Sequence, residues 1–326
     1  MEDTGMSEST GRKILVKIPF TEEQKKKISA AADGVEVIYK KAEELTEQDV
    51  AEAEVIMGNL PKEKIQAARN LKWLQLNSAG ADLYCQPGVL KDSVALTNAS
   101  GAYDISVSEY MISATLALMK KLYPYHVNQQ NHQWKDEGGV MAAQGACILV
   151  LGLGNIGLRY ARVMKAMGSY IIGIRRHAGT VPEEVDELHT MADLEECLKR
   201  ADIVAAVLPG TPQTLHLLGR EQFAAMKRSA YLINAGRGNS VDPDALYDAL
   251  EQGEIAGAVL DVMEQEPLPA DHRLWNAQNL YLTPHVAGGF HIPVTLDLIA
   301  EICADNLKRY LAGEALTHVV NRELGY

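Results

Sequence analysis

The chain has 326 residues, about twice the usual length of one domain, and is 47% hydrophobic and 23% charged, which excludes a largely disordered protein. Its 31 lysines and arginines against 43 acidic residues leave a net charge of −12, which argues against broad binding to a nucleic-acid backbone. No apolar run approaches the length of a membrane span, and the polar, acidic start MEDTGMSESTGRK does not resemble a signal peptide.

The first hundred residues alternate short apolar runs with amphipathic stretches, the pattern of a parallel α/β sheet. Strands are predicted over residues 14–18, 35–39, 54–57, 73–76 and 95–98, and helices over 22–32 and 62–70. A long helical stretch rich in Met and Ala follows over 103–122 and could bridge two lobes, whereas the polar run 128–131 predicts a loop.

A second α/β series opens at Ala146. Its strands are predicted over residues 147–151, 170–174, 203–207, 230–234, 257–261 and 280–282. Helices are predicted over 157–166, 191–199, 220–226 and 242–252, and a last helix over 293–311. Six strands with intervening helices is the number that a complete dinucleotide-binding domain needs.

A glycine-rich turn of the form G-x-G-x-x-G follows the first strand of this second series and leads directly into an amphipathic helix. In this setting the first glycine permits the tight turn, the second lets the backbone approach a pyrophosphate, and the third allows close packing of helix on strand. The predicted dinucleotide contacts in this turn are Gly152, Gly154, Asn155, Ile156 and Gly157.

The end of the next strand bears on which dinucleotide is bound. An acidic residue about 20 positions after the glycine turn would bind the ribose 2′-hydroxyl and select NAD. Here the strand ends in Arg175-Arg176-His177, with no acid before Glu183. Two arginines would attract a 2′-phosphate through bidentate hydrogen bonds, so the pattern favours NADP(H). NAD(H) stays possible if both arginines are merely solvated.

Three further segments each place a titratable residue just past the end of a predicted strand, where open α/β sheets bind ligands. The first is N-x-x-R-G from Asn234, with Arg237 as its arginine. The second is D-x-x-x-x-E-P-L-P from Asp261, with Glu266 as its glutamate. The third is the Pro-His pair that ends at His285.

Together with the glycine turn, these segments resemble the D-isomer-specific 2-hydroxyacid dehydrogenase family, and in particular its glyoxylate/hydroxypyruvate reductase branch. The resemblance covers essentially the whole chain. It implies an α/β fold of two doubly wound lobes: a flavodoxin-like substrate lobe of residues 1–101 and 291–326, and an inserted Rossmann dinucleotide-binding lobe of residues 102–290. It also implies a cleft that closes on the substrate.

The family motifs fall on Arg237, Glu266 and His285, which are therefore the predicted catalytic residues. The resemblance implies NAD(P)H-dependent, reversible reduction of a small 2-keto acid to a D-2-hydroxy acid, with NADPH favoured. In this chemistry His285 supplies a proton to the forming alkoxide, and Glu266 holds the imidazole and favours its charged form. Arg237 matches the substrate carboxylate and polarises the keto oxygen.

The remaining predicted contacts are assigned by resemblance. Asp261 corresponds to the family residue that contacts the nicotinamide carboxamide, and the loop on the adenosine side supplies Pro209 and Thr214. Ala235 is a further predicted cofactor contact. Small residues suit close approach of backbone N–H groups to a substrate carboxylate, and the predicted substrate contacts are Ser78, Ala79, Gly80 and Arg237. No metal site is predicted.

Alternatives stay open. A dinucleotide-sensing, corepressor-like scaffold, a phosphoglycerate dehydrogenase without a regulatory domain, and a formate- or phosphonate-type oxidoreductase share this fold. Of these, Glu266 argues against formate enzymes, which carry Gln there, and the stop at Tyr326 argues against a regulated phosphoglycerate enzyme. The expected partner besides a keto acid is a second copy in a homodimer, with no nucleic acid and no membrane.

The cysteines bear on the location of the protein. The chain has four, Cys85, Cys147, Cys197 and Cys303, which are widely scattered and have no metal-binding or redox spacing. They are expected to be reduced core thiols, which predicts a cytoplasmic protein.

Overall fold

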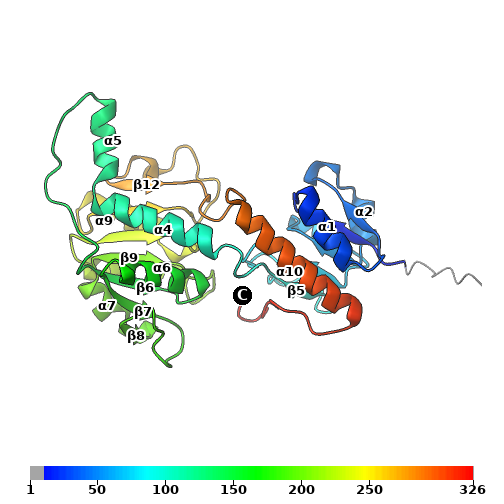
Figure 1. Cartoon of the computed structure of the whole chain (residues 1–326). Coiled ribbons are helices and arrows are strands. Elements are labelled where there is room, and N and C mark those ends of the chain that lie inside the picture. Colours follow the sequence, from blue (N-terminus) through cyan, green and yellow to red (C-terminus); the bar gives the residue numbers. More distant parts are fainter. Residues whose placement is uncertain (1–10, 326) are drawn as a thin grey trace, which may run out of the picture. The chain divides into compact units, whose positions relative to one another are not determined.

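The computed structural model describes residues 11–325, so residues 1–10 and 326 of the predicted substrate lobe lie outside the described part. The chain divides into two compact units (Figure 1). Unit 1 consists of the residues up to Tyr103 and from Phe290 onward, and unit 2 runs from Asp104 to Gly289. The boundaries predicted from the sequence, after residue 101 and before residue 291, differ from these by two residues and one residue.

Unit 1 is built on a five-stranded parallel sheet in the order β2-β1-β3-β4-β5, the flavodoxin-like order that was predicted. Its strands are β1 (Ile14–Val16), β2 (Val37–Tyr39), β3 (Val55–Met57), β4 (Trp73–Gln75) and β5 (Ala95–Thr97). Its helices are α1 (Glu22–Ala31), α2 (Glu47–Glu52), α3 (Lys62–Gln66) and α10 (Pro293–Ala312), with a 3-10 turn over Ala42–Glu44.

Helices cover both faces of this sheet, which explains why its strands are mostly apolar. Helices α1 and α10 pack together over one face, where Ile28 of α1 and Leu307 of α10 join Trp73 in one hydrophobic cluster (Figure 1). The cluster on the other face contains Val50 of α2 and Ile65 of α3. Although α10 lies far from α1 in sequence, the two helices pack together, so the segment after Gly289 completes unit 1.

Unit 2 contains a seven-stranded parallel sheet in the order β12-β11-β10-β9-β6-β7-β8. Its strands are β6 (Cys147–Leu151), β7 (Tyr170–Ile174), β8 (Glu187–His189), β9 (Ile203–Ala206), β10 (Tyr231–Asn234), β11 (Gly257–Leu260) and β12 (Leu280–Leu282). Its helices are α4 (Asp104–Met119), α5 (Leu122–Gln130), α6 (Asn155–Ala166), α7 (Leu194–Arg200), α8 (Arg220–Ala225) and α9 (Pro243–Glu251), with 3-10 turns at Met191–Asp193, Gly238–Ser240 and Arg273–Asn276. The six strands β8-β7-β6-β9-β10-β11, read across the sheet, have the Rossmann order, and β12 extends the sheet beyond β11.

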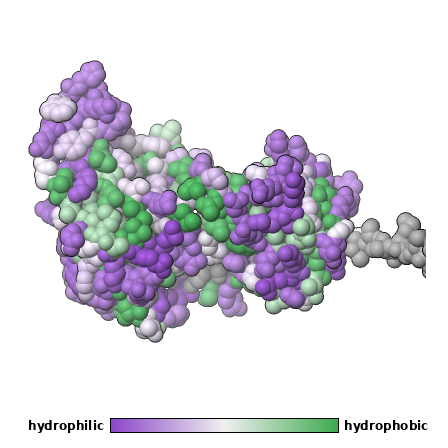
Figure 2. Space-filling view, in the orientation of Figure 1, coloured by the Kyte–Doolittle hydropathy of each residue, from purple (hydrophilic) through white to green (hydrophobic). Residues whose placement is uncertain are grey.

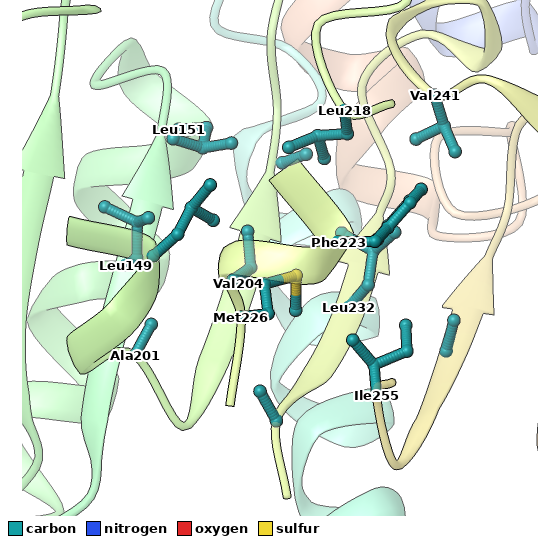
Figure 3. Packing of buried hydrophobic residues seen from close by; sticks show 14 of the residues in the cluster. Leu149, Leu151, Ala201, Val204, Leu218, Phe223, Met226, Leu232, Val241 and Ile255 are labelled. Atoms are coloured by element: carbon teal, nitrogen blue, oxygen red, sulfur yellow. The ribbon is translucent and has the colours of Figure 1, made fainter. Parts of the chain in front are cut away.

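The core of unit 2 explains why its strands were predicted closely. Alternate strand residues such as Leu149, Val204 and Leu232 face a cluster that also includes Phe223 of α8 and Ile255 (Figure 3). Helices α7, α8 and α9 all contribute side chains to this cluster, and α4 packs against α6. A parallel sheet covered by helices reads as continuous apolar runs, and these runs mark the strands in the sequence.

Two predictions about unit 2 are wrong. The sheet has a seventh strand, β8, in which Glu187 and His189 are polar; β8 is an edge strand and pairs only with β7. The predicted loop at 128–131 is the end of helix α5. The helix predicted over 103–122 is α4, which ends at Met119; α5 begins at Leu122, after Lys121, whose φ of 55° is left-handed.

Helix α5 and the loop that follows it project from unit 2 as an arm of residues 120–145 (Figure 1). The visible face of the arm is mainly hydrophilic (Figure 2). Four large apolar side chains of the arm are nonetheless exposed: Leu122, Val127, Trp134 and Val140. Over residues 11–325, no helix is both long and apolar enough to cross a membrane.

Candidate active site

The glycine turn joins β6 to α6 with little room to spare. Gly152 has a φ of 99°, which L-side chains rarely adopt, and a Cβ on Gly152 would lie 2.7 Å from the Val207 carbonyl oxygen. A Cβ on Gly157 would lie 2.0 Å from the Gly152 carbonyl oxygen. Both glycines are therefore required by the chain's own packing, as predicted for the tight turn and the close helix–strand contact.

Gly154 differs from its two neighbours in the motif. A Cβ there would meet no atom of the described chain within 4 Å, and Gly154 and Asn155 are exposed. Gly154 is also the N-cap of α6, and no side chain of residues 11–325 caps this twelve-residue helix. The free N–H groups and the open backbone fit the pyrophosphate of a dinucleotide, because a helix N-terminus attracts anions.

The two arginines after β7 occupy different environments. The Arg175 guanidinium donates from Nε to the His177 carbonyl oxygen at 2.9 Å and from Nη2 to the Thr180 carbonyl oxygen at 3.2 Å. Arg175 is partly buried by this turn, whereas Arg176 is exposed. Arg175 thus shapes the turn over residues 177–180, and Arg176 projects from it.

The loop after β9 is braced by its own hydroxyl groups. Thr214 is buried, and its Oγ1 donates to the Pro209 carbonyl oxygen at 2.7 Å and accepts from the Thr211 N–H at 2.9 Å. A Cβ on Gly236, in the next loop, would lie 2.6 Å from the Leu208 nitrogen. The side chain of Thr214 shapes this loop, and its contact with a cofactor stays a prediction.

Arg237 stands in a turn that Asn234 organises. The buried Asn234 side chain donates to the Arg237 carbonyl oxygen at 3.0 Å and accepts from the Gly236 N–H at 3.1 Å. Ala235 continues β10 through a hydrogen bond from its N–H to the Ala206 carbonyl oxygen at 3.2 Å. A Cβ on Gly238 would lie 1.9 Å from the Met263 carbonyl carbon, so the loops after β10 and β11 pack backbone to backbone.

The side chains of Glu266 and His285, both in unit 2, lie within hydrogen-bond distance of each other. Glu266 Oε2 lies 2.7 Å from His285 Nδ1, and Glu266 Oε1 accepts the Met263 N–H at 2.9 Å. The side chains are partly exposed, 38% for Glu266 and 51% for His285. A carboxylate at Nδ1 leaves the other ring nitrogen, Nε2, available for proton transfer.

Asp261 lies between these loops and is only 2% exposed. Its Oδ1 accepts hydrogen bonds from the Thr283 hydroxyl at 2.6 Å and the Val286 N–H at 2.9 Å. Its Oδ2 accepts the Ala287 N–H at 2.9 Å. Asp261 thus binds the backbone around His285, and its predicted contact with the nicotinamide carboxamide stays a prediction.

The predicted substrate loop lies after β4 in unit 1, and its carbonyl groups face the protein. The Asn77 carbonyl oxygen accepts a hydrogen bond from the Tyr103 hydroxyl. The Ser78 carbonyl oxygen accepts the Ala99 N–H at 2.9 Å, and the Ala79 carbonyl oxygen accepts Asn98 Nδ2–H at 2.8 Å. Burial raises the pKa of Tyr103 to about 12, so it remains a donor.

The N–H groups of this loop are oriented differently from its carbonyls. Within the described chain, the N–H groups of residues 78–80 donate to no other group. Asn59, two residues after β3, holds the loop by two hydrogen bonds. Its N–H donates to Asn77 Oδ1 at 2.8 Å, and its Nδ2 donates to Ser78 Oγ at 2.9 Å. Three consecutive unpaired donors form a site suited to an anion.

The predicted residues of unit 2 gather at one edge of its sheet, because they follow the carboxyl ends of β6, β7, β9, β10, β11 and β12. The sequence did not indicate four residues whose side chains or backbone hold the predicted loops in place: Asn59, Tyr103, Tyr110 and Thr283. Asn59 and Thr283 share one usable signal, a polar residue one or two positions after a strand. Over residues 11–325, no group of three metal-ligating side chains lies together.

Comparisons with known proteins agree with this geometry. The sequence profile described as D-isomer specific 2-hydroxyacid dehydrogenase, NAD binding domain, matches residues 112–287. The chain is similar to D-3-phosphoglycerate dehydrogenase of Methanocaldococcus jannaschii, with 32% identity over 95% of this chain, although it spans only 59% of that enzyme's length.

Two solved structures are similar over nearly the whole chain. One is a D-isomer specific 2-hydroxyacid dehydrogenase family protein from Aeromonas salmonicida, with a TM-score of 0.86 and 30% identity over 96% of this chain and 100% of that one. The other is the NADPH-dependent glyoxylate/hydroxypyruvate reductase of Sinorhizobium meliloti in complex with NADP and sulfate, with a TM-score of 0.82 and 29% identity over 97% and 100%. The chain therefore belongs to the D-isomer-specific 2-hydroxyacid dehydrogenase family, a family of NAD(P)-dependent oxidoreductases.

The contrast between Gly154 and Gly157 gives a test of the dinucleotide site. Gly157→Ala is expected to lower the free energy of unfolding by about 1–3 kcal/mol, because its Cβ meets the Gly152 carbonyl. Gly154→Ala is expected to leave the melting temperature of the coenzyme-free protein unchanged but to weaken NADPH binding about tenfold or more, which costs about 1.4 kcal/mol. Thermal denaturation and fluorescence titration with NADPH measure the two effects. Unchanged NADPH binding by Gly154→Ala would remove the pyrophosphate from this turn.

Proposed function

We propose that the protein reduces a small 2-keto acid, such as glyoxylate or hydroxypyruvate, to the D-2-hydroxy acid with NADPH. The observation that carries the proposal is the 2.7 Å contact between Glu266 and His285 at the sheet edge that also carries Arg237 and the glycine turn. A proton donor, a guanidinium and a dinucleotide turn at one edge are the groups that this reduction requires. The name of the Sinorhizobium meliloti relative supports the choice of acids.

NADPH, when bound, supplies a hydride from C4 of its nicotinamide to the keto carbon. His285 gives its Nε2 proton to the oxygen that becomes the hydroxyl, a step typically worth about 10²–10⁴-fold in rate. Glu266 balances the imidazolium charge and fixes the ring through Nδ1. The Arg237 guanidinium binds the carboxylate and polarises the keto oxygen.

The substrate carboxylate is also assigned to the N–H groups of residues 78–80. The support is the orientation of this loop: its carbonyls at residues 77–79 are held by hydrogen bonds from Tyr103, Ala99 and Asn98. The N–H groups then remain for an anion. Because this binding uses backbone rather than a shaped side-chain pocket, it accepts the carboxylate of any 2-keto acid.

The direct test follows NADPH oxidation with glyoxylate, hydroxypyruvate, pyruvate, phenylpyruvate, 2-ketoisocaproate and 3-phosphohydroxypyruvate. The last acid is included because one relative is named a phosphoglycerate dehydrogenase. We expect the highest kcat/KM with glyoxylate or hydroxypyruvate, and a D product by chiral chromatography. Tight coenzyme binding without turnover of any acid would contradict the proposed reaction and favour a dinucleotide sensor.

The preference for NADPH is assigned mainly to Arg176. Its support is the exposure of Arg176 and its place two residues after Ile174, whose carbonyl oxygen accepts the N–H of Gly152 in the glycine turn at 3.0 Å. Arg176→Ala is expected to raise the Kd for NADPH about 10- to 100-fold, since a hydrogen bond to a charged group contributes about 1.5–3 kcal/mol, and to leave the Kd for NADH unchanged. Arg175→Ala should weaken NADPH binding less.

Arg162→Ala is the matched control for this pair of variants. Arg162 lies on α6, is exposed and pairs with Glu184, so its removal changes the net charge equally without touching the 175–180 turn. Its Kd values for both coenzymes should equal those of the wild type. Equal affinity of the wild type for NADH and NADPH would rule out binding of the 2′-phosphate by Arg175 and Arg176.

We also propose a homodimer whose interface is formed by the arm of residues 120–145. The support is the four exposed apolar side chains of the arm, of which Trp134 is entirely exposed. A second copy fits this surface, because a two-fold dimer presents the same patch on both subunits, with about 800 Å² buried on each. Sedimentation velocity should give a dimer at micromolar concentration and a shift toward monomer for Val127→Ser/Trp134→Ser. A monomeric wild type would contradict the proposal.

A cytoplasmic location is part of the same proposal. All four cysteines are free thiols in the structure, and Cys197 and Cys303 are buried. Burial raises the pKa of the Cys303 thiol, which keeps it protonated and unreactive. Such thiols suit a reducing compartment.

A further inference from the structure

A continuous chain of hydrogen bonds runs from helix α4 to the backbone that carries His285. The Tyr110 hydroxyl lies 2.6 Å from Thr283 Oγ1, and the Thr283 hydroxyl donates to Asp261 Oδ1 at 2.6 Å. We propose that Tyr110 and Thr283 are positioning residues that act through Asp261 to fix the imidazole of His285. The inference rests on the proposed function for its kinetic readout only.

His285 needs such a support because of its backbone conformation. Its φ of 53° lies in the left-handed region, which a residue with a side chain adopts only when its surroundings hold it there. The His285 N–H donates to the Asp261 carbonyl oxygen at 2.8 Å. The next two N–H groups, of Val286 and Ala287, donate to the two carboxylate oxygens of Asp261 at 2.9 Å each. Three consecutive N–H groups thus donate to one residue, the first to the backbone carbonyl of Asp261 and the next two to its carboxylate.

The direction of the hydrogen bonds in this chain follows from its last link. The Thr283 hydroxyl has a single proton and donates it to Asp261 Oδ1. Thr283 Oγ1 must then accept from the Tyr110 hydroxyl. Burial raises the pKa of Tyr110 to about 12, which keeps the phenol a donor at physiological pH. The chain therefore has one arrangement of protons and one geometry.

Helix α4 contacts both ends of the segment 283–287, which contains His285. The Ser106 hydroxyl donates to the Ala287 carbonyl oxygen, and Ser106 lies one helical turn before Tyr110 on the same face of α4. The two hydroxyls contact Thr283, two residues before His285, and Ala287, two residues after it. A hydroxyl removed from α4 therefore releases the segment without removing any group that touches the substrate.

The test compares Tyr110→Phe, Thr283→Val and Thr283→Ser with the wild type, using the best keto acid and saturating NADPH. We expect kcat to fall about 3- to 10-fold for Tyr110→Phe and about tenfold or more for Thr283→Val, since each loses a buried hydrogen bond. Thr283→Ser keeps the hydroxyl and should recover kcat to within about twofold of the wild type. The Kd for NADPH should change less than kcat in all three.

A double mutant separates positioning from general loosening. If both hydroxyls act through Asp261, Tyr110→Phe/Thr283→Val should be no slower than Thr283→Val alone. Tyr160→Phe is the matched control. It removes the buried phenol hydroxyl of Tyr160 on α6, which lies 2.8 Å from the hydroxyl of Thr115 on α4, the helix that also carries Tyr110. It should lower the melting temperature without changing kcat. Additive losses, or a loss of kcat in Tyr160→Phe equal to that of Tyr110→Phe, would overturn the inference.

A second readout does not depend on turnover. The imidazole Cε1–H resonance of His285, assigned by its absence in His285→Gln, should shift or broaden in Tyr110→Phe and Thr283→Val but not in Thr283→Ser or Tyr160→Phe. If the wild type reduces no keto acid, the proposed function fails and this spectrum still decides the inference. A resonance unchanged in Tyr110→Phe and Thr283→Val would overturn it.

Discussion

The 2.7 Å contact between Glu266 Oε2 and His285 Nδ1 is the interaction on which the candidate site depends. It is made by loops after β11 and β12, so both loops must be held in place before the two side chains can meet. The Met263 N–H holds the other Glu266 oxygen, and Gly238 lets the Arg237 turn approach the Met263 backbone. The contact between Glu266 and His285 is therefore a consequence of tight packing between backbone segments at the carboxyl ends of the strands.

The fold was predictable where burial controls the sequence. Strands such as β6, buried on both faces, read as apolar runs, and predictions there agree with the structure to within one or two residues. Prediction failed where burial gives no pattern. Edge strand β8 has polar residues because it pairs on one side only, and the projecting helix α5 has polar residues because much of its surface faces solvent. Neither carries the periodic apolar signal on which sequence reasoning relies.

The site was predictable in its residue types but less so in the direction of its side chains. A motif places Asp261, Thr214 and Arg175 near the ligand-binding edge, yet in the structure their polar atoms face the protein's own loops. That outcome depends on which backbone groups come within hydrogen-bond reach, and this is decided by tertiary packing. The same reason hid Tyr110, whose hydroxyl gains a role only through the placement of α4 beside Thr283.

The most direct test of this account is chemical rescue of His285→Ala by added imidazole, with NADPH and the best keto acid. The side chain of His285 is 51% exposed, so free imidazole can enter the space that it leaves beside Glu266. The account predicts that His285→Ala binds NADPH normally but loses about 10²–10⁴-fold in kcat, and that imidazole restores activity in a saturable manner. A His285→Ala protein as active as the wild type without imidazole would contradict the assignment of His285 as the proton donor.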